Sequence, residues 1–141
     1  MTDQTLTLGW TQAQAAKALR SYRLVLGFNM AVHVLIGLAC ILCPGWVADM
    51  AGLPEAMPVG WERGWGATLL LVTLLYVPGW LSPLVARAPN LIGIAGRLWM
   101  AVIWLICGGG FLWFALFDGF FCVVLGLLYR RLLTTHLMTH P

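Results

Sequence analysis

The sequence predicts an all-α integral membrane protein, with four transmembrane helices in an antiparallel up-down bundle and both termini in the cytoplasm. The first observation is composition: hydrophobic residues make up 61% of the 141 residues and charged residues 9%. A soluble domain carries about 25% charged residues, so this chain cannot build a water-exposed surface. The second observation is the apolar run Phe111–Tyr129, whose single charge is Asp118. A run of about 20 apolar residues matches the hydrocarbon core of a bilayer.

Three further apolar runs precede this one, and proline and glycine mark their ends. Pro44-Gly45 follows the first run, Pro78-Gly79 follows the second, and the triple glycine Gly108–Gly110 separates the last two. The runs are apolar at odd and even positions alike, whereas strands of outer-membrane barrels alternate. We therefore predict a single transmembrane domain, residues 1–141, with spans at about 24–43, 61–77, 91–108 and 111–129.

Two segments outside these spans are predicted to lie in the membrane interface. Residues 11–23 place small and apolar side chains on one side of a helix, with Lys17 and Arg20 on another. This pattern predicts an amphipathic lead-in to the first span, with Thr11 as its cap. The connection Trp46–Gly60 is predicted to begin with one or two helical turns.

The basic residues predict the orientation of the bundle. Of the 8 Lys and Arg residues, only Arg63 falls on the side of the Trp46–Gly60 connection. Because cytoplasmic loops carry an excess of Lys and Arg, we expect a bacterial-type inner membrane with both termini inside. The residues on the predicted cytoplasmic side are Lys17, Arg20, Arg23, Arg87, Arg97, Arg130 and Arg131.

Each span carries one stripe of small or polar residues at helical spacing, which predicts its inner face. Small residues let membrane helices approach closely, and polar residues find partners inside a bundle. The four stripes are Asn29, His33, Gly37 and Cys40; Glu62, Gly66, Thr73 and Tyr76; Gly93, Arg97, Ala101, Trp104 and Gly108; and Ala115, Asp118, Cys122 and Gly126.

The ionisable residues on these stripes predict a buried polar cluster near the middle of the bundle. His33 lies roughly 15 Å from the cytoplasmic edge and Asp118 roughly 18 Å from it, at the helical rise of 1.5 Å per residue. Asp118 is either a proton-handling or ligand-orienting carboxylate or one half of an ion pair that sets helix register. Its partner is Arg97 or Arg63, and the sequence does not choose between them. The predicted cluster is His33, Arg97, Asp118, Asn29 and Arg63.

His33 is the one histidine within a span, and it admits four interpretations: haem ligand, quinone-contacting donor, part of a proton relay, or hydrogen-bonded structural residue. Haem b usually has a second strong axial ligand, and no other span contains a histidine. No cofactor is therefore predicted, with haem or quinone kept as alternatives. His136 and His140 have helical spacing but no third ligand nearby, so no metal site is predicted either.

The first span ends with the sequence Cys40-Ile41-Leu42-Cys43-Pro44. A Cys-x-x-Cys at the outer end of a span in a four-helix protein resembles the membrane oxidoreductases that pass electrons from disulfides to quinone. The resemblance implies a redox role for Cys40 and Cys43. The alternative, from the position of all four cysteines in or beside apolar runs, is buried free thiols; the other two are Cys107 and Cys122.

The leading functional prediction is a small, non-catalytic inner-membrane subunit with an accessory, anchoring or assembly role. Its expected partner is a larger membrane complex or a second copy of the chain. The grounds are the small extramembrane mass and the lack of a complete catalytic set. Two alternatives are kept. One is a redox subunit that binds quinone or haem through His33 with Cys40 and Cys43, and the other is a small oligomeric transporter or channel with Asp118 as the coupling group. The dispersed net charge of +3 predicts no nucleic-acid partner.

Overall fold

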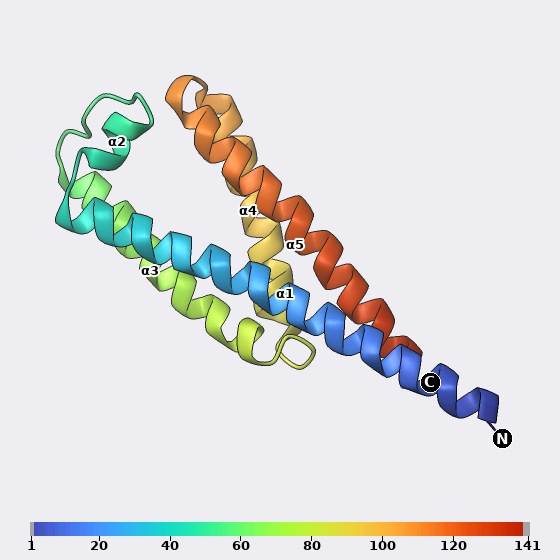
Figure 1. Cartoon of the computed structure of the whole chain (residues 1–141). Helices are drawn as coiled ribbons and strands as arrows, with labels where there is room; N and C mark the ends of the chain where they lie inside the picture. The colour runs from blue at the N-terminus through green and yellow to red at the C-terminus, as the bar shows by residue number, and fades with distance from the viewer. Residues whose placement is uncertain (1, 140–141) are drawn as a thin grey trace.

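The computed structural model describes residues 2–139, with side chains placed for residues 11–138, and this part of the chain is helical apart from short connections (Figure 1). Proline and glycine occupy most of the connections, as the sequence predicts. The elements are α1 (Thr2–Leu42), α2 (Trp46–Met50), α3 (Gly60–Leu81), α4 (Arg87–Cys107), the 3₁₀ turn η1 (Gly109–Phe111) and α5 (Leu112–Thr139).

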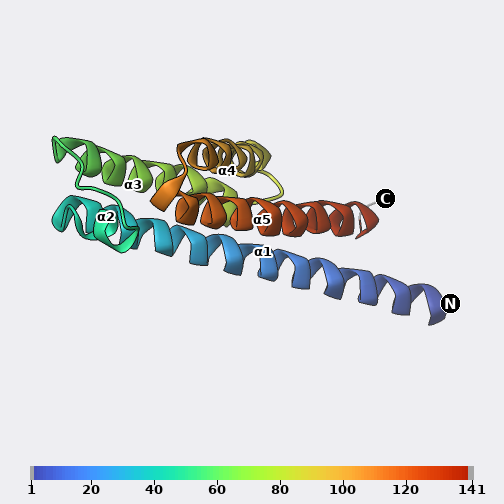
Figure 2. The same ribbon diagram turned by 90° about the horizontal axis from the view of Figure 1, so that it is seen from above.

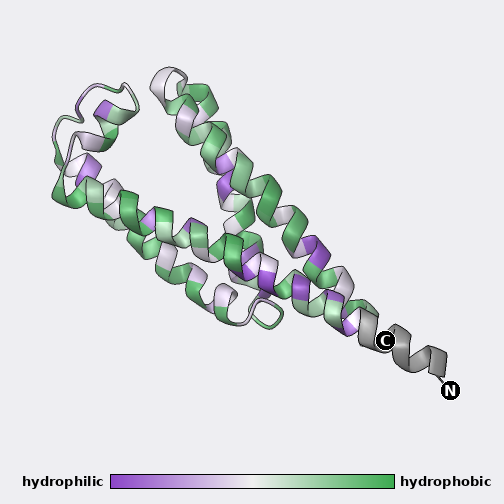
Figure 3. Ribbon diagram, in the orientation of Figure 1, coloured by the Kyte–Doolittle hydropathy of each residue, from purple (hydrophilic) through white to green (hydrophobic). Residues whose placement is uncertain are grey.

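Four helices, α1, α3, α4 and α5, are long and apolar enough to cross a membrane, which suggests a membrane protein. The 22 residues of α3 and 21 of α4 give lengths of about 33 and 32 Å, close to the roughly 30 Å of a bilayer core. Hydrophobic residues cover most of these helices (Figure 3). The predicted all-helical chain with four candidate spans is therefore confirmed.

The long helices pack as two pairs, α1 with α3 and α4 with α5, and α1 also contacts α5. Figure 2 shows α5 lying between α1 and α4. In Figure 1 the two pairs diverge toward the end that carries α2 and η1, which we call the α2 end. At the opposite end, which we call the terminal end, α5 finishes alongside α1.

At the terminal end, α1 and α5 bury a continuous row of side chains. The predicted lead-in at 11–23 is not a separate interfacial helix, since α1 passes through it without a break. Ala18 and Tyr22 within it pack on α5, which itself extends beyond the predicted end at Tyr129 to Thr139. The two rows, at helical spacing, are Ala18, Tyr22 and Leu26 on α1 and Leu125, Tyr129 and Leu132 on α5.

The second span also ends later than predicted, because α3 continues through Pro78-Gly79 to Leu81. Side chains from other helices bond the carbonyl groups of this last turn. Arg23 Nε donates to the Trp80 carbonyl at 3.0 Å, and Trp80 Nε1 donates to the Arg23 carbonyl at 2.9 Å. Asn90 Nδ2 donates to the Gly79 carbonyl at 3.2 Å. These tertiary bonds stabilise a turn that local sequence rules would end at proline.

The predicted inner faces of α1 and α3 are buried along their whole length. The small residues there allow close contact: a Cβ added at Gly66 would lie 2.6 Å from the Gly37 carbonyl oxygen. On α5 the predicted stripe is partly wrong. Ala115 is buried, but Cys122 and Gly126 are only half-buried, and the buried row continues instead through Phe121, Leu125 and Tyr129. Larger side chains are needed there because α5 lies between two helices.

Candidate functional site

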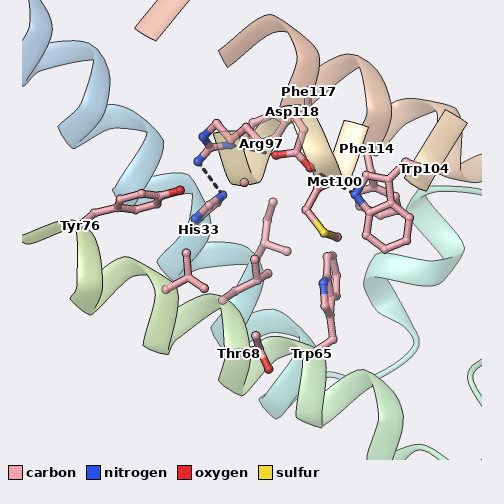
Figure 4. A pocket seen from close by; sticks show the side chains of 14 residues that line it. His33, Trp65, Thr68, Tyr76, Arg97, Met100, Trp104, Phe114, Phe117 and Asp118 are labelled. Atoms are coloured by element: carbon pink, nitrogen blue, oxygen red, sulfur yellow. Dashed lines mark hydrogen bonds and ion pairs between the residues drawn. The ribbon is translucent and has the colours of Figure 1, made fainter. Parts of the chain in front are cut away.

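The guanidinium group of Arg97 joins three helices at the centre of the bundle (Figure 4). Arg97 lies on α4 and is 3% exposed. Its Nη1 donates to Asp118 Oδ1 on α5 at 2.9 Å, which is also an ion pair. Its Nη2 donates to Asn29 Oδ1 and to His33 Nε2 on α1, the latter at 3.1 Å. We call Asn29, His33, Arg97 and Asp118 the polar cluster.

Both carboxylate oxygens of Asp118 are hydrogen-bonded. Oδ1 accepts from Arg97 and Oδ2 accepts from Trp104 Nε1 at 3.2 Å. Trp104 lies two turns after Arg97 on the same face of α4, so one helix supplies both donors. A buried charge is tolerated only when it is paired and hydrogen-bonded, and Asp118 satisfies both conditions.

Aromatic rings surround the positive charge of Arg97. The guanidinium carbon lies 5.8 Å from the ring centre of Tyr76, 6.0 Å from that of Phe117 and 5.6 Å from that of Phe121. Each distance is within the range in which a ring quadrupole attracts a cation. The sequence placed Tyr76 on an inner face but did not indicate the two phenylalanines, although both flank Asp118 within one turn.

A cavity of about 240 Å³ lies beside the polar cluster, between the α1–α3 pair and the α4–α5 pair. His33, Arg97 and Asp118 line one part of it, and apolar and aromatic groups line most of the rest. Figure 4 shows Trp65 reaching across from α3 toward Met100 and Trp104. An apolar cavity with a few convergent polar groups is the usual form of a small-molecule site.

The hydrogen bond from Arg97 defines the protonation of His33. A guanidinium group has only donors, so His33 Nε2 must accept, and the imidazole is neutral with its proton on Nδ1. That Nδ1 is buried with no partner among the described residues, and the same is true of Asn29 Nδ2 and Arg97 Nε. The polar cluster thus contains three buried donors without an acceptor.

This donor excess limits the chemistry available to the polar cluster. Both titratable groups are engaged within the polar cluster: the Nε2 of His33 and both oxygens of Asp118 already accept hydrogen bonds. A haem ligand needs a free imidazole lone pair, so the geometry of His33 does not favour haem. Three unpartnered donors instead match a group with hydrogen-bond acceptors.

Arg63 does not belong to the polar cluster, and its prediction as a buried residue is wrong. It is exposed near the start of α3, whereas its neighbour Glu62 is buried. Adjacent helical residues point about 100° apart, so the turn that directs Glu62 inward directs Arg63 outward. Asp118 pairs with Arg97.

The four cysteines are free thiols in different environments. Cys40 is buried against Gly66, whereas Cys43 and Cys107 are exposed, which corrects the prediction that all four are buried. Both exposed thiols lie where their helices end at the α2 end. His136 lies on α5, and His140 lies outside the described residues.

The fold and the site together are those of a helical membrane protein with a polar cluster beside a cavity between its two helix pairs. No protein-family model, curated protein or solved structure shows significant similarity to the chain. The geometry of the site therefore carries the functional argument.

Proposed function

We propose that this protein is a small, non-catalytic membrane subunit that binds a lipophilic molecule in the cavity beside the polar cluster. The observation that carries the proposal is the donor excess: His33 and Arg97 line the cavity, and each retains a buried donor without a partner. The other two ionisable side chains of the polar cluster, His33 and Asp118, are both held in hydrogen bonds. This supports binding over catalysis.

The charge of the polar cluster favours a neutral ligand. Arg97 and Asp118 cancel, and His33 is neutral. A carbonyl oxygen supplies acceptors without adding an unpaired charge beside the buried ion pair. The aromatic lining suits a flat ring. Of the alternatives raised by the sequence, a quinone has all three properties, whereas haem binding and proton coupling through Asp118 receive no support from the geometry.

A cavity-filling substitution tests this function. Gly96 lines the cavity, and a Cβ there would meet no heavy atom within 4 Å. We therefore expect Gly96→Leu to fold normally and to bind tritiated menadione, a small quinone, at least about tenfold more weakly than the unchanged protein in nanodiscs. The matched control is Gly64→Leu on α3, which also meets no atom within 4 Å and does not line the cavity.

Menadione is compared with 2-methylnaphthalene, which has the same ring frame without carbonyl groups. We expect the quinone to bind about tenfold more tightly, because only it can accept from the polar cluster. Equal binding of both compounds, or equal menadione binding by both glycine variants, would contradict the proposal.

For the orientation we propose that both termini are cytoplasmic, with the α2 end outside. The support is the position of the basic residues: Arg63 is the one Lys or Arg residue near the α2 end, and the charge of Arg97 is neutralised by Asp118. The native cysteines offer a test, because Cys43 and Cys107 are exposed at the α2 end while Cys40 is buried.

A membrane-impermeant maleimide added to intact cells is expected to label Cys43 or Cys107 and to leave Cys40 unlabelled. The control is Thr134→Cys, at an exposed position near the terminal end, in a chain whose native cysteines are replaced by serine. It should react only after the membrane is permeabilised. Labelling of this control in intact cells would reverse the proposed orientation.

A further inference from the structure

A second cavity, of about 360 Å³, lies at the α2 end. We call it the outer cavity. Its walls come from α3, the end of α4, the α2 region and the start of α5. Three of its residues, Trp65, Trp104 and Phe114, also line the first cavity, so aromatic rings separate the two spaces. Its volume falls within the range of small-molecule sites.

The outer cavity contains an unusual carboxylate. Glu62 lines it and is 9% exposed. Its Oε2 accepts from the Gly45 backbone N–H at 2.8 Å, but Oε1 is buried and has no partner among the described residues. A buried carboxylate that is only half satisfied is costly unless a positive charge approaches it. No basic side chain lines the cavity among the described residues, and a second acid, Glu55, does.

Five aromatic rings face the same space: Trp61, Trp65, Trp104, Phe111 and Phe114. Trp104 stacks on Phe111 with ring centres 5.3 Å apart, and Trp65 meets Phe114 edge-on at 5.5 Å. Aromatic residues that line a space together with a carboxylate are the combination found in sites that recognise alkylated ammonium groups. The polar cluster next door holds its charges in a neutral pair, so the negative charge is specific to the outer cavity.

We propose that the outer cavity binds an organic ammonium ion, with the positive nitrogen near Glu62 and its alkyl groups against the rings. The outer cavity suits an organic cation better than a divalent metal, because no group of three or more acidic, histidine or cysteine ligands occurs among the described residues. An alkylated ammonium needs only charge and aromatic surface, and the outer cavity has both.

Phenyltrimethylammonium and its neutral isostere tert-butylbenzene test the proposal, each titrated by calorimetry into protein in phosphatidylglycerol nanodiscs, with empty nanodiscs as the blank. We expect the cation to bind at least about tenfold more tightly than the isostere. Glu62→Gln should lose about tenfold in affinity for the cation and leave the isostere unchanged, since the amide oxygen still accepts from Gly45. Equal binding of the two compounds, or full cation affinity in Glu62→Gln, would overturn the proposal.

Three other variants make the result independent of folding and of the quinone proposal. Asp49→Asn removes an exposed acid at the same end that does not line the outer cavity, so it should bind the cation normally. Trp61→Leu keeps the wall apolar but removes one ring, and should weaken cation binding severalfold. Gly96→Leu, which fills only the first cavity, should leave cation binding unchanged, so that failure of one site is distinguishable from failure of the other.

The ammonium group can come from a free cation or from a lipid headgroup, and the nanodisc composition separates these sources. Adding phosphatidylcholine to the phosphatidylglycerol discs supplies a competing trimethylammonium headgroup. A drop in affinity for phenyltrimethylammonium in the mixed discs identifies the lipid as an occupant. Unchanged affinity assigns the outer cavity to free organic cations.

Discussion

Replacing Arg97 with methionine is expected to destabilise the folded protein by about 3–5 kcal/mol, the usual effect of removing one partner of a buried ion pair. The substitution leaves Asp118 with its charge and only the Trp104 hydrogen bond. It also removes the donor to Asn29 and His33 on α1, so the contact between three helices is lost. Unfolding in mixed micelles titrated with dodecyl sulfate, followed by circular dichroism, measures the difference.

Two further variants decide whether the lost stability reflects the charge left unpaired. The double substitution Arg97→Met with Asp118→Leu should be more stable than Arg97→Met alone, because no unpaired charge remains. Arg63→Met, at an exposed arginine, should stay within about 0.5 kcal/mol of the unchanged protein. If Arg97→Met were no less stable than Arg63→Met, the polar cluster would not hold the helices together.

Gly66→Ala is expected to destabilise the protein by about 1–3 kcal/mol, the range found when extra carbon atoms are forced into a packed interior. The added Cβ would lie 2.6 Å from the Gly37 carbonyl oxygen and 2.8 Å from the Cys40 Cβ. Neither neighbour is the end of a flexible side chain, so α1 and α3 must move apart. The same dodecyl sulfate titration measures the change.

The matched control for this substitution is Gly64→Ala, two residues earlier on the same helix. Its Cβ would meet no heavy atom within 4 Å. Alanine also has a higher helix propensity than glycine, so this variant should be more stable by about 0.5–1 kcal/mol. Opposite signs at the two positions are the expected result, and equal effects would count against close packing of α1 on α3.

The sequence predicted all four residues of the polar cluster, because their positions follow from helical periodicity and depth. Asn29 and His33 lie one turn apart on α1, and the long side chain of Arg97 reaches from a shallower position on α4 toward the depth of Asp118 on α5. The choice of Arg97 over Arg63 as the partner of Asp118 could not be made this way. It depends on the packing of α4 against α5, which brings Arg97 to Asp118.

Two features were harder to predict from the sequence: where the helices end, and where cavities remain. Both depend on contacts between segments that are distant in the sequence. Proline at position 78 signals the end of a helix locally, yet Arg23 and Asn90 bond the carbonyl groups of the turn that follows. The lead-in at 11–23 has an amphipathic pattern, yet its Ala18 and Tyr22 pack into a core shared with α5. The unpartnered oxygen of Glu62 likewise becomes visible only once its surroundings are known.

The sequence by itself determined that the chain forms four apolar helices and that each carries one stripe of small or polar residues. Both properties are local, since they follow from hydropathy and from a repeat of 3.6 residues. The tertiary structure alone decided which stripes meet, which arginine neutralises Asp118, and where two cavities remain between the helices. Those outcomes depend on how whole helices pack in three dimensions, and no short stretch of sequence carries that information.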